Sequence, residues 1–134
     1  MKFAEHIKVT NYGNHYSTEI IAGDHTLTTD EPIEDGGQNE GPTAFQMLLS
    51  SLGACTAITV RMYADRKKWD LKEIHVYLNM EKVIENNEDV TKIYRKIEFE
   101  GNLDPDQIQR LMIISDKCPV HKTLEGKIEV VEMK

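Results

Sequence analysis

Two cysteines, Cys55 and Cys118, are the residues of this sequence best suited to do chemistry. They lie too far apart in the chain to form a CxxC redox pair or a zinc-ribbon pair. Two cysteines are also too few for the disulfide framework of a small secreted protein. In a reducing compartment, such thiols are either inert core residues or nucleophiles kept reactive for a purpose.

The two cysteines lie in different local sequence environments. Cys55 lies in the most hydrophobic segment of the chain, where a cysteine is typically a small buried apolar residue. Cys118 precedes Pro119 at the expected start of a helical turn, where unpaired backbone N–H groups favour a thiolate and His121 is close by. From local features alone, Cys118 could be reactive or structural.

The segment that carries Cys55 is expected to be a long helix. Apolar residues from 45 to 63 cover nearly its whole circumference, which predicts a buried helix. Polar residues interrupt the segment too often for a membrane span. Thr43 and Gln46 have capping-box spacing and predict the helix start, and the cationic residues 66–68 suit its C-terminal end.

The remaining elements alternate between strands and short helices, which predicts an α+β fold. Arg95 interrupts the apolar face of its predicted strand, and Asp104-Pro105 is a typical helix start. We expect a hairpin of strands 3–10 and 16–21, a strand at 25–29, a polar loop at 30–41, a hairpin of strands 74–80 and 93–99 around a turn at 86–89, a helix from 105 to about 117, a turn from Pro119 to Gly126, and a last strand at 128–131.

Length and charge limit the classes of function. The 134 residues suit one domain, predicted to span 1–134. A net charge of −7, with acidic residues spread along the chain, argues against binding nucleic acid or anionic membranes. The first eight residues contain no apolar signal-peptide core, so we expect a cytoplasmic protein.

Two sequence segments resemble the signatures of a known family. The first comprises residues 41–43 and 48–57, the latter reading LLSSLGACTA around Cys55, and the second comprises residues 117–125, reading KCPVHKTLE around Cys118. They are similar to the two motifs of the OsmC/Ohr family of thiol-dependent hydroperoxide reductases. The expected order of strands and helices also resembles that family. The resemblance therefore implies an OsmC-like α+β fold, a largely antiparallel sheet packed on a buried central helix and a second helix.

The resemblance also implies a mechanism. Cys55 would attack an organic or small hydroperoxide and become a sulfenic acid, and Cys118 would condense with it to form a disulfide that an external dithiol reduces. No cofactor and no metal is expected. Members of this family are intertwined homodimers, which would explain a helix that is apolar all round.

The sequence departs from the family pattern around the nucleophile. The family holds its thiolate with an arginine from the N-terminal strands, but no arginine precedes Arg61, and Gln46 stands where a carboxylate is expected. Without a fixed cation, the pKa of a buried cysteine should rise. Candidate supporting residues are His121, Gln46 and Arg61, and the other cations that could substitute are Lys8, His15 and His25.

Two other functions stay open at this point. The chain could be a non-catalytic module of the same fold that binds an apolar ligand or a thiol metabolite, or a dimerisation domain with inert thiols. A metal site made of Cys55, Cys118 and His121 has no obvious fourth ligand, so we do not expect one. The histidines other than His121 are expected to be surface residues: His6, His15, His25 and His75.

Overall fold

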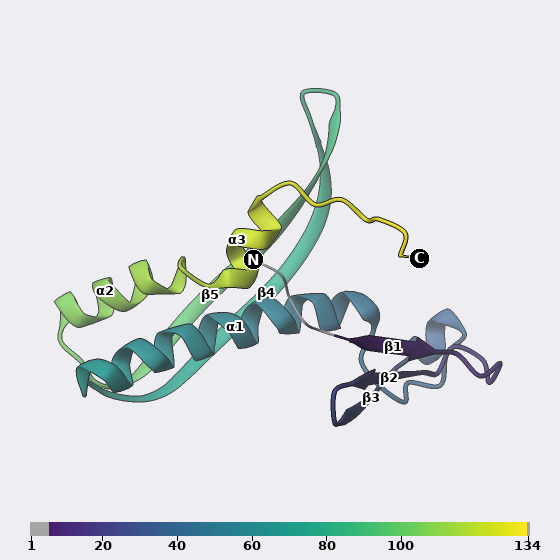
Figure 1. Ribbon diagram of the computed structural model, residues 1–134. Helices are drawn as coiled ribbons and strands as arrows, with labels where there is room; N and C mark the ends of the chain where they lie inside the picture. The colour runs from purple at the N-terminus through teal and green to yellow at the C-terminus, as the bar shows by residue number, and fades with distance from the viewer. Residues whose placement is uncertain (1–5, 134) are drawn as a thin grey trace. The chain divides into compact units, whose positions relative to one another are not determined.

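A computed structural model describes residues 6–133 of the chain. It is a mixed α+β structure with antiparallel sheets, as the sequence predicts (Figure 1). The chain forms two compact units, one that ends at Leu48 and one that begins at Leu49. The strands are divided between a three-stranded sheet in the first unit and a two-stranded sheet in the second.

The first unit contains a three-stranded meander. Its strands β1 (Ile7–Thr10), β2 (Thr18–Ala22) and β3 (His25–Thr29) pair antiparallel in the order β1-β2-β3. The predicted hairpin and third strand are therefore confirmed, although residues 3–5 of the first predicted strand lie outside the part of the chain that the structure describes.

The predicted polar loop is ordered around one buried carboxylate. Asp30 is 3% exposed and accepts hydrogen bonds from the backbone N–H groups of Glu31, Gln38 and Glu40, at 2.7, 3.3 and 3.1 Å. The loop also contains a short 3₁₀ helix, η1 (Ile33–Asp35). The Asp30 carboxylate thus satisfies backbone N–H groups that pairing with another strand would satisfy in a sheet.

The long helix α1 (Ala44–Lys67) begins with the predicted capping box. The Gln46 amide oxygen accepts from the Thr43 N–H at 2.9 Å, and the Thr43 hydroxyl accepts from the Gln46 N–H at 3.1 Å. By length and composition alone, α1 could also span a bilayer, a test that core helices of soluble proteins pass as well.

The prediction that α1 is buried on all sides is wrong for the single chain. One face is buried, comprising Leu52, Gly53, Thr56, Val60 and Ala64. Large apolar side chains on the rest of the helix are exposed, namely Phe45, Leu48, Ile58 and Met62. A helix contacts one neighbouring layer with one face only. The apolar residues on its other faces stay exposed unless a second layer covers them.

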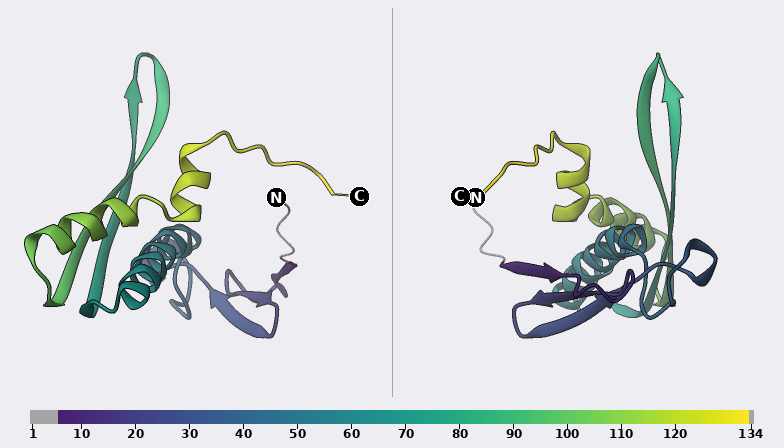
Figure 2. Two further views of the ribbon diagram at one scale, coloured as in Figure 1. Left: turned by 60° about the vertical axis from the view of Figure 1, so that its left-hand side comes forward. Right: turned by 90° about the vertical axis from the view of Figure 1, so that its right-hand side faces the viewer.

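A long hairpin, β4 (Asp70–Glu85) and β5 (Glu88–Asn102), forms the sheet of the second unit. Asn86 and Asn87 connect the strands with positive φ angles of 52° and 64°, the geometry of a tight hairpin turn. The end of the hairpin extends beyond the helices of this unit in every view (Figure 2). Both strands are longer than the alternation in the sequence predicts.

The two faces of the hairpin differ in chemistry. Ile74 pairs with Phe99 and Val76 with Ile97 on the face toward α1, where Gly53 allows the helix to approach the side chain of Leu78. The opposite face carries the polar residues that alternate with them. A bulge between Leu71 and Glu73 sets this alternation.

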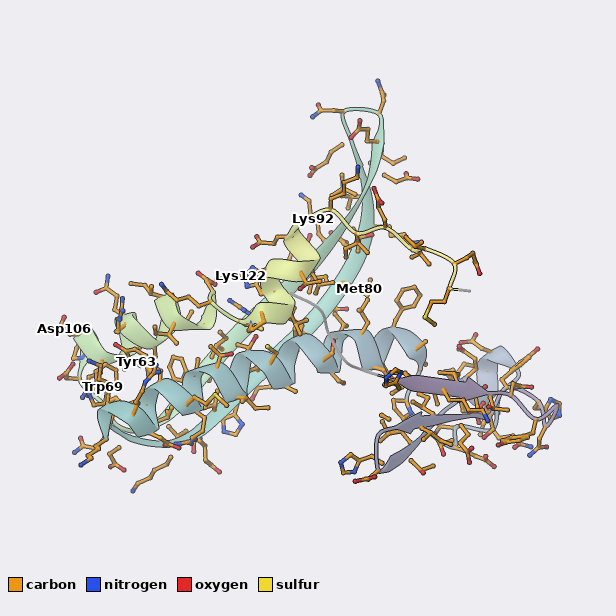
Figure 3. All side chains as sticks on the ribbon, in the orientation of Figure 1. Tyr63, Trp69, Met80, Lys92, Asp106 and Lys122 are labelled. Carbon is orange, nitrogen blue, oxygen red and sulfur yellow. The ribbon has the colours of Figure 1, made fainter. Side chains whose placement is uncertain are left out.

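Two shorter helices complete the second unit. Helix α2 (Pro105–Ser115) begins with a capping box between Asp104 and Gln107, and α3 (Pro119–Glu125) begins at Cys118 and ends at Gly126. Leu111 of α2 packs into the core with Val60, Ala64 and Leu71. The Tyr63 and Trp69 rings meet edge to face near the end of α1 (Figure 3).

The predicted C-terminal strand does not form. Residues 127–133 have no regular secondary structure, and Val130 is 98% exposed. A strand is stable only when its backbone pairs with another strand, and the second unit has no strand hydrogen-bonded to this segment among the residues described.

Candidate functional site

The fold of the second unit brings the two cysteines together. Cys55 lies on α1 and is half-buried, whereas Cys118 is fully buried at the N-terminal end of α3, and both thiols are reduced. The Cys55 thiol is close enough to hydrogen-bond with the Cys118 thiol. Two sulfurs remote in sequence are therefore neighbours in one chain.

Backbone N–H groups from the first turn of α3 face both sulfurs. The His121 N–H donates to Cys118 Sγ at 3.4 Å, which makes the thiol the N-cap of the helix. The Val120 N–H donates to the Cys55 sulfur. Pro119, which has no N–H, occupies the first position of the turn, so the next two N–H groups are left for the two sulfurs.

The environment of Cys55 favours the neutral thiol. Burial raises the pKa of Cys55, and the hydrogen bond and charge of the adjacent Cys118 raise it further. The Val120 N–H and the Thr59 hydroxyl oppose this by lowering the pKa, but the net shift is upward. The sequence-based expectation of a raised pKa at this cysteine is confirmed in direction.

A largely enclosed arginine on β5 connects the elements around the sulfurs. The Arg95 side chain is only 14% exposed, and its Nη1 donates to the Thr56 hydroxyl on α1 and to the Ser115 carbonyl on α2, each at 3.3 Å. Its Nη2 bonds Asp116 Oδ1 at 2.7 Å, just after α2. Nη1 also lies 3.2 Å from His121 Nδ1 on α3.

His121 is held on both sides of its ring. A guanidinium can only donate, so a hydrogen bond between Arg95 and Nδ1 requires this nitrogen to accept. Nδ1 also lies 4.0 Å from Asp116 Oδ1, and Nε2 lies 3.1 Å from Glu125 Oε1 one turn later in α3. His121 therefore connects α3 to Arg95.

Next to this network is a cleft of about 380 Å³. Arg95, His121 and Glu125 supply its polar side, and the remaining lining residues are Leu52, Thr91, Ile93 and Leu124. The cleft suits a small molecule with both an apolar part and a polar group. Neither sulfur contributes to this lining, so the cleft lies beside the cysteine pair.

The structure separates the predicted supporting residues. His121 lies beside Cys118, whereas Gln46 caps the start of α1 and Arg61 donates to the carbonyls of Leu71 and Lys72 at 2.6 and 2.9 Å. Arg61 therefore anchors the beginning of β4 to α1 and is not placed at the sulfurs. The other suggested cations, Lys8, His15 and His25, belong to the first unit.

Arg95 is the site residue that the sequence analysis missed. The sequence did contain an indication of this role, because Arg95 interrupts the apolar face of its strand. A cation is tolerated on such a face only when nearby polar groups form hydrogen bonds with it. Its described hydrogen bonds reach oxygen and nitrogen atoms and none reaches a sulfur. Arg95 therefore positions the elements that carry the thiols, instead of binding a thiolate itself.

Replacing Arg95 should loosen this arrangement. We expect Arg95→Met to lower the free energy of unfolding by about 2 kcal/mol or more, because acceptors on α1 and α2 lose their donor. Lys96→Met is the matched control: the neighbouring side chain is exposed on the opposite face, and a change there should stay within about 0.5 kcal/mol. Urea unfolding in the presence of a reductant measures both, and equal values would contradict a positioning role for Arg95.

Comparison with solved structures shows the same fold in several proteins. The chain is similar to an OsmC-like protein from Mycoplasma pneumoniae, with 21% identity, a TM-score of 0.76, and 94% of this chain and 90% of that chain covered. It is also similar to organic hydroperoxide resistance proteins from Legionella pneumophila (16% identity, TM-score 0.67, 94% and 92% covered) and Elizabethkingia anophelis (19% identity, TM-score 0.67, 96% and 94% covered).

Sequence comparison assigns the family. A search of curated proteins gave no significant match. The family model described as OsmC-like protein matches residues 37–132, a region that contains both cysteines, Arg95 and His121. With the fold of the solved structures and a family match over most of its length, the chain belongs to the OsmC family.

Proposed function

We propose that this chain is a thiol-dependent hydroperoxide reductase in which Cys55 attacks the peroxide and Cys118 resolves the product. The observation that carries the proposal is the contact between two reduced thiols that come from different helices. The printed names of the solved relatives from Legionella pneumophila and Elizabethkingia anophelis, organic hydroperoxide resistance proteins, agree with this reaction class.

The degree of burial of the two sulfurs supports these roles. Cys55 is half-buried and can meet a small substrate, whereas Cys118 is inaccessible to solvent but next to Cys55. A resolving thiol needs to reach only the oxidised partner sulfur. The order of attack follows from this difference in access.

The reaction balances over two steps. The Cys55 thiolate attacks one peroxide oxygen, the O–O bond breaks, and the leaving alkoxide takes a proton to become an alcohol, which leaves Cys55 as a sulfenic acid. The Cys118 sulfur then attacks the Cys55 sulfur, the S–O bond breaks, and the hydroxide leaves as water with the Cys118 proton. An external dithiol returns two electrons and restores both thiols.

A second candidate function is a binding module without peroxidase activity. The raised pKa of Cys55 and the cleft lined by Arg95, His121 and Glu125 favour it, because a ligand there needs no thiolate. In this case the cleft would hold a small molecule with an apolar part and a polar group, and the wild-type protein would consume no peroxide.

We also propose that the chain acts as a homodimer. The exposed apolar residues of α1 and of α2, which include Ile108, Met112 and Ile113, lie on the two longest helices. The C-terminal segment adds Ile128, Val130 and Val131, apolar residues of strand-forming type that are exposed in the single chain. A second copy would cover these surfaces and supply a pairing strand.

Serine variants of the two cysteines test the catalytic roles. We expect Cys55→Ser to abolish peroxide consumption with a dithiol reductant, because no thiolate remains for the attack. Without reductant, Cys118→Ser should still consume one equivalent of peroxide and stop as the Cys55 sulfenic acid, which mass spectrometry detects as a trapped adduct. Undiminished turnover by Cys55→Ser would end the proposal, and absence of turnover by the wild-type protein would favour the binding module.

The raised pKa of Cys55 predicts a pH dependence. Below its pKa the thiolate fraction rises about tenfold with each pH unit, so the rate of peroxide attack should climb steadily from pH 6 to about pH 9. Stopped-flow measurement of the first oxidation in the wild-type protein, which keeps the contribution of Cys118 to this pKa, follows this step. A rate that is already constant at pH 6 would show that the Cys55 pKa is lowered instead.

The mass of the protein in solution tests the homodimer. Light scattering coupled to size exclusion should give twice the 15.4 kDa of one chain. Met62→Glu, which places a charge on the exposed apolar face of α1, should shift the protein toward the monomer. Lys67→Glu at the polar end of the same helix is the control, and a monomeric wild-type protein would refute the dimer.

A further inference from the structure

We propose that Glu73, His75 and Glu100 form a binding site for a divalent transition-metal ion of the zinc class, separate from the cysteine pair. One ligand atom from each of these side chains lies within 4.8 Å of the other two. All three residues are on the polar face of the β4–β5 hairpin, the face directed away from α1. The proposal is independent of the proposed peroxidase function.

The β-bulge at the base of the hairpin creates this cluster. Before the bulge, Leu71 pairs with Gly101, and after it, Glu73 pairs with Glu100 and His75 with Glu98. Lys72 is the extra residue. If Lys72 instead took a regular place in the ladder, Glu73 would pair with Phe99 and His75 with Ile97, so the bulge places a histidine and two carboxylates together on one face.

The separations between the side chains suit a metal ion. His75 Nε2 lies 3.8 Å from Glu73 Oε2 and 3.7 Å from Glu100 Oε1. In a tetrahedral site with bonds of about 2.1 Å, the ligand atoms lie about 3.4 Å from one another. Both His75 separations are therefore a few tenths of an ångström longer than in such a site, and the two carboxylates lie within 4.8 Å of each other.

The charges of the cluster also favour a cation. Like charges directly opposite each other on antiparallel strands are destabilising, and Glu73 faces Glu100 in this way. A divalent ion would place positive charge between the two carboxylates and remove this repulsion.

Neighbouring charges leave the site open to a cation. Glu98, directly opposite His75, is paired with Lys96 at 3.1 Å, and Lys96 in turn lies over the Tyr77 ring. Glu98 therefore has its own partner, whereas the carboxylates of Glu73 and Glu100 share only His75 and each other in the described contacts.

The donor set indicates which ion would bind. One imidazole nitrogen with two carboxylate oxygens suits zinc and neighbouring first-row metals, whereas calcium and magnesium prefer all-oxygen sites. Three protein ligands leave a fourth position for water. The side chains are 40% to 60% exposed, so the ion would exchange readily with solvent.

The expectation that His75 lies at the surface agrees with its 40% exposed side chain, and the proposed site adds a role to that position. The alternation of β4 already places Glu73 and His75 on one face, but the contribution of Glu100 depends on the strand register. That register depends on the bulge, which the sequence pattern did not reveal.

Titration of the full-length protein with zinc tests the site. The experiment uses a Cys55→Ser, Cys118→Ser double variant, so that neither thiol can bind the metal, and circular dichroism verifies its fold. Isothermal calorimetry should show one ion per chain. His75→Gln and Glu100→Gln, added separately, should each weaken binding about tenfold or more.

Glu98→Gln is the matched control, because it removes the same charge from the same face but no ligand. It should bind zinc within about threefold of the parent, since it acts only through screened surface electrostatics. Cobalt bound to reduced wild-type protein should show a nitrogen and oxygen spectrum without a thiolate charge-transfer band. No binding, or binding that His75→Gln and Glu100→Gln leave unchanged, would overturn the proposal.

Discussion

The arrangement around the cysteines depends on the hydrogen bonds of one partly buried guanidinium. Arg95 links β5 to Thr56 on α1, to Ser115 at the end of α2, and to His121 on α3. A buried charge is tolerated only where several acceptors surround it, and here those acceptors belong to all three helices of the second unit. The same bonds that satisfy the arginine therefore hold the helix that carries Cys118 against the helix that carries Cys55.

This arrangement has consequences for the chemistry of the thiols. The Arg95 cation is used for positioning, and the described donors to the two sulfurs are backbone N–H groups, a hydroxyl and the neighbouring thiol. Burial outweighs the N–H and hydroxyl donors and raises the pKa of Cys55. In the proposed reaction, disulfide formation would therefore rely on the proximity of the two sulfurs more than on a large standing population of thiolate.

Local chemistry determined which features the sequence could predict. The capping box of Thr43 and Gln46, the Asn86-Asn87 turn and the Asp104-Pro105 helix start depend on residues close in sequence, and all three form as expected. The contact between the cysteines was implied only by family resemblance. The role of Arg95 depends on the packing of three helices, and the exposure of one face of α1 and of the C-terminal segment depends on which other elements the fold places beside them, which local sequence does not determine.

Peptide mapping of the oxidised protein tests the central claim most directly. The reduced protein is treated with one equivalent of an organic hydroperoxide, alkylated and digested without reductant. If the two sulfurs are neighbours held by the Arg95 network, mass spectrometry will show the Cys55 peptide joined to the Cys118 peptide, with both cysteines from the same chain. A product with both cysteines free and alkylated, or with links only between separate chains, would contradict the account.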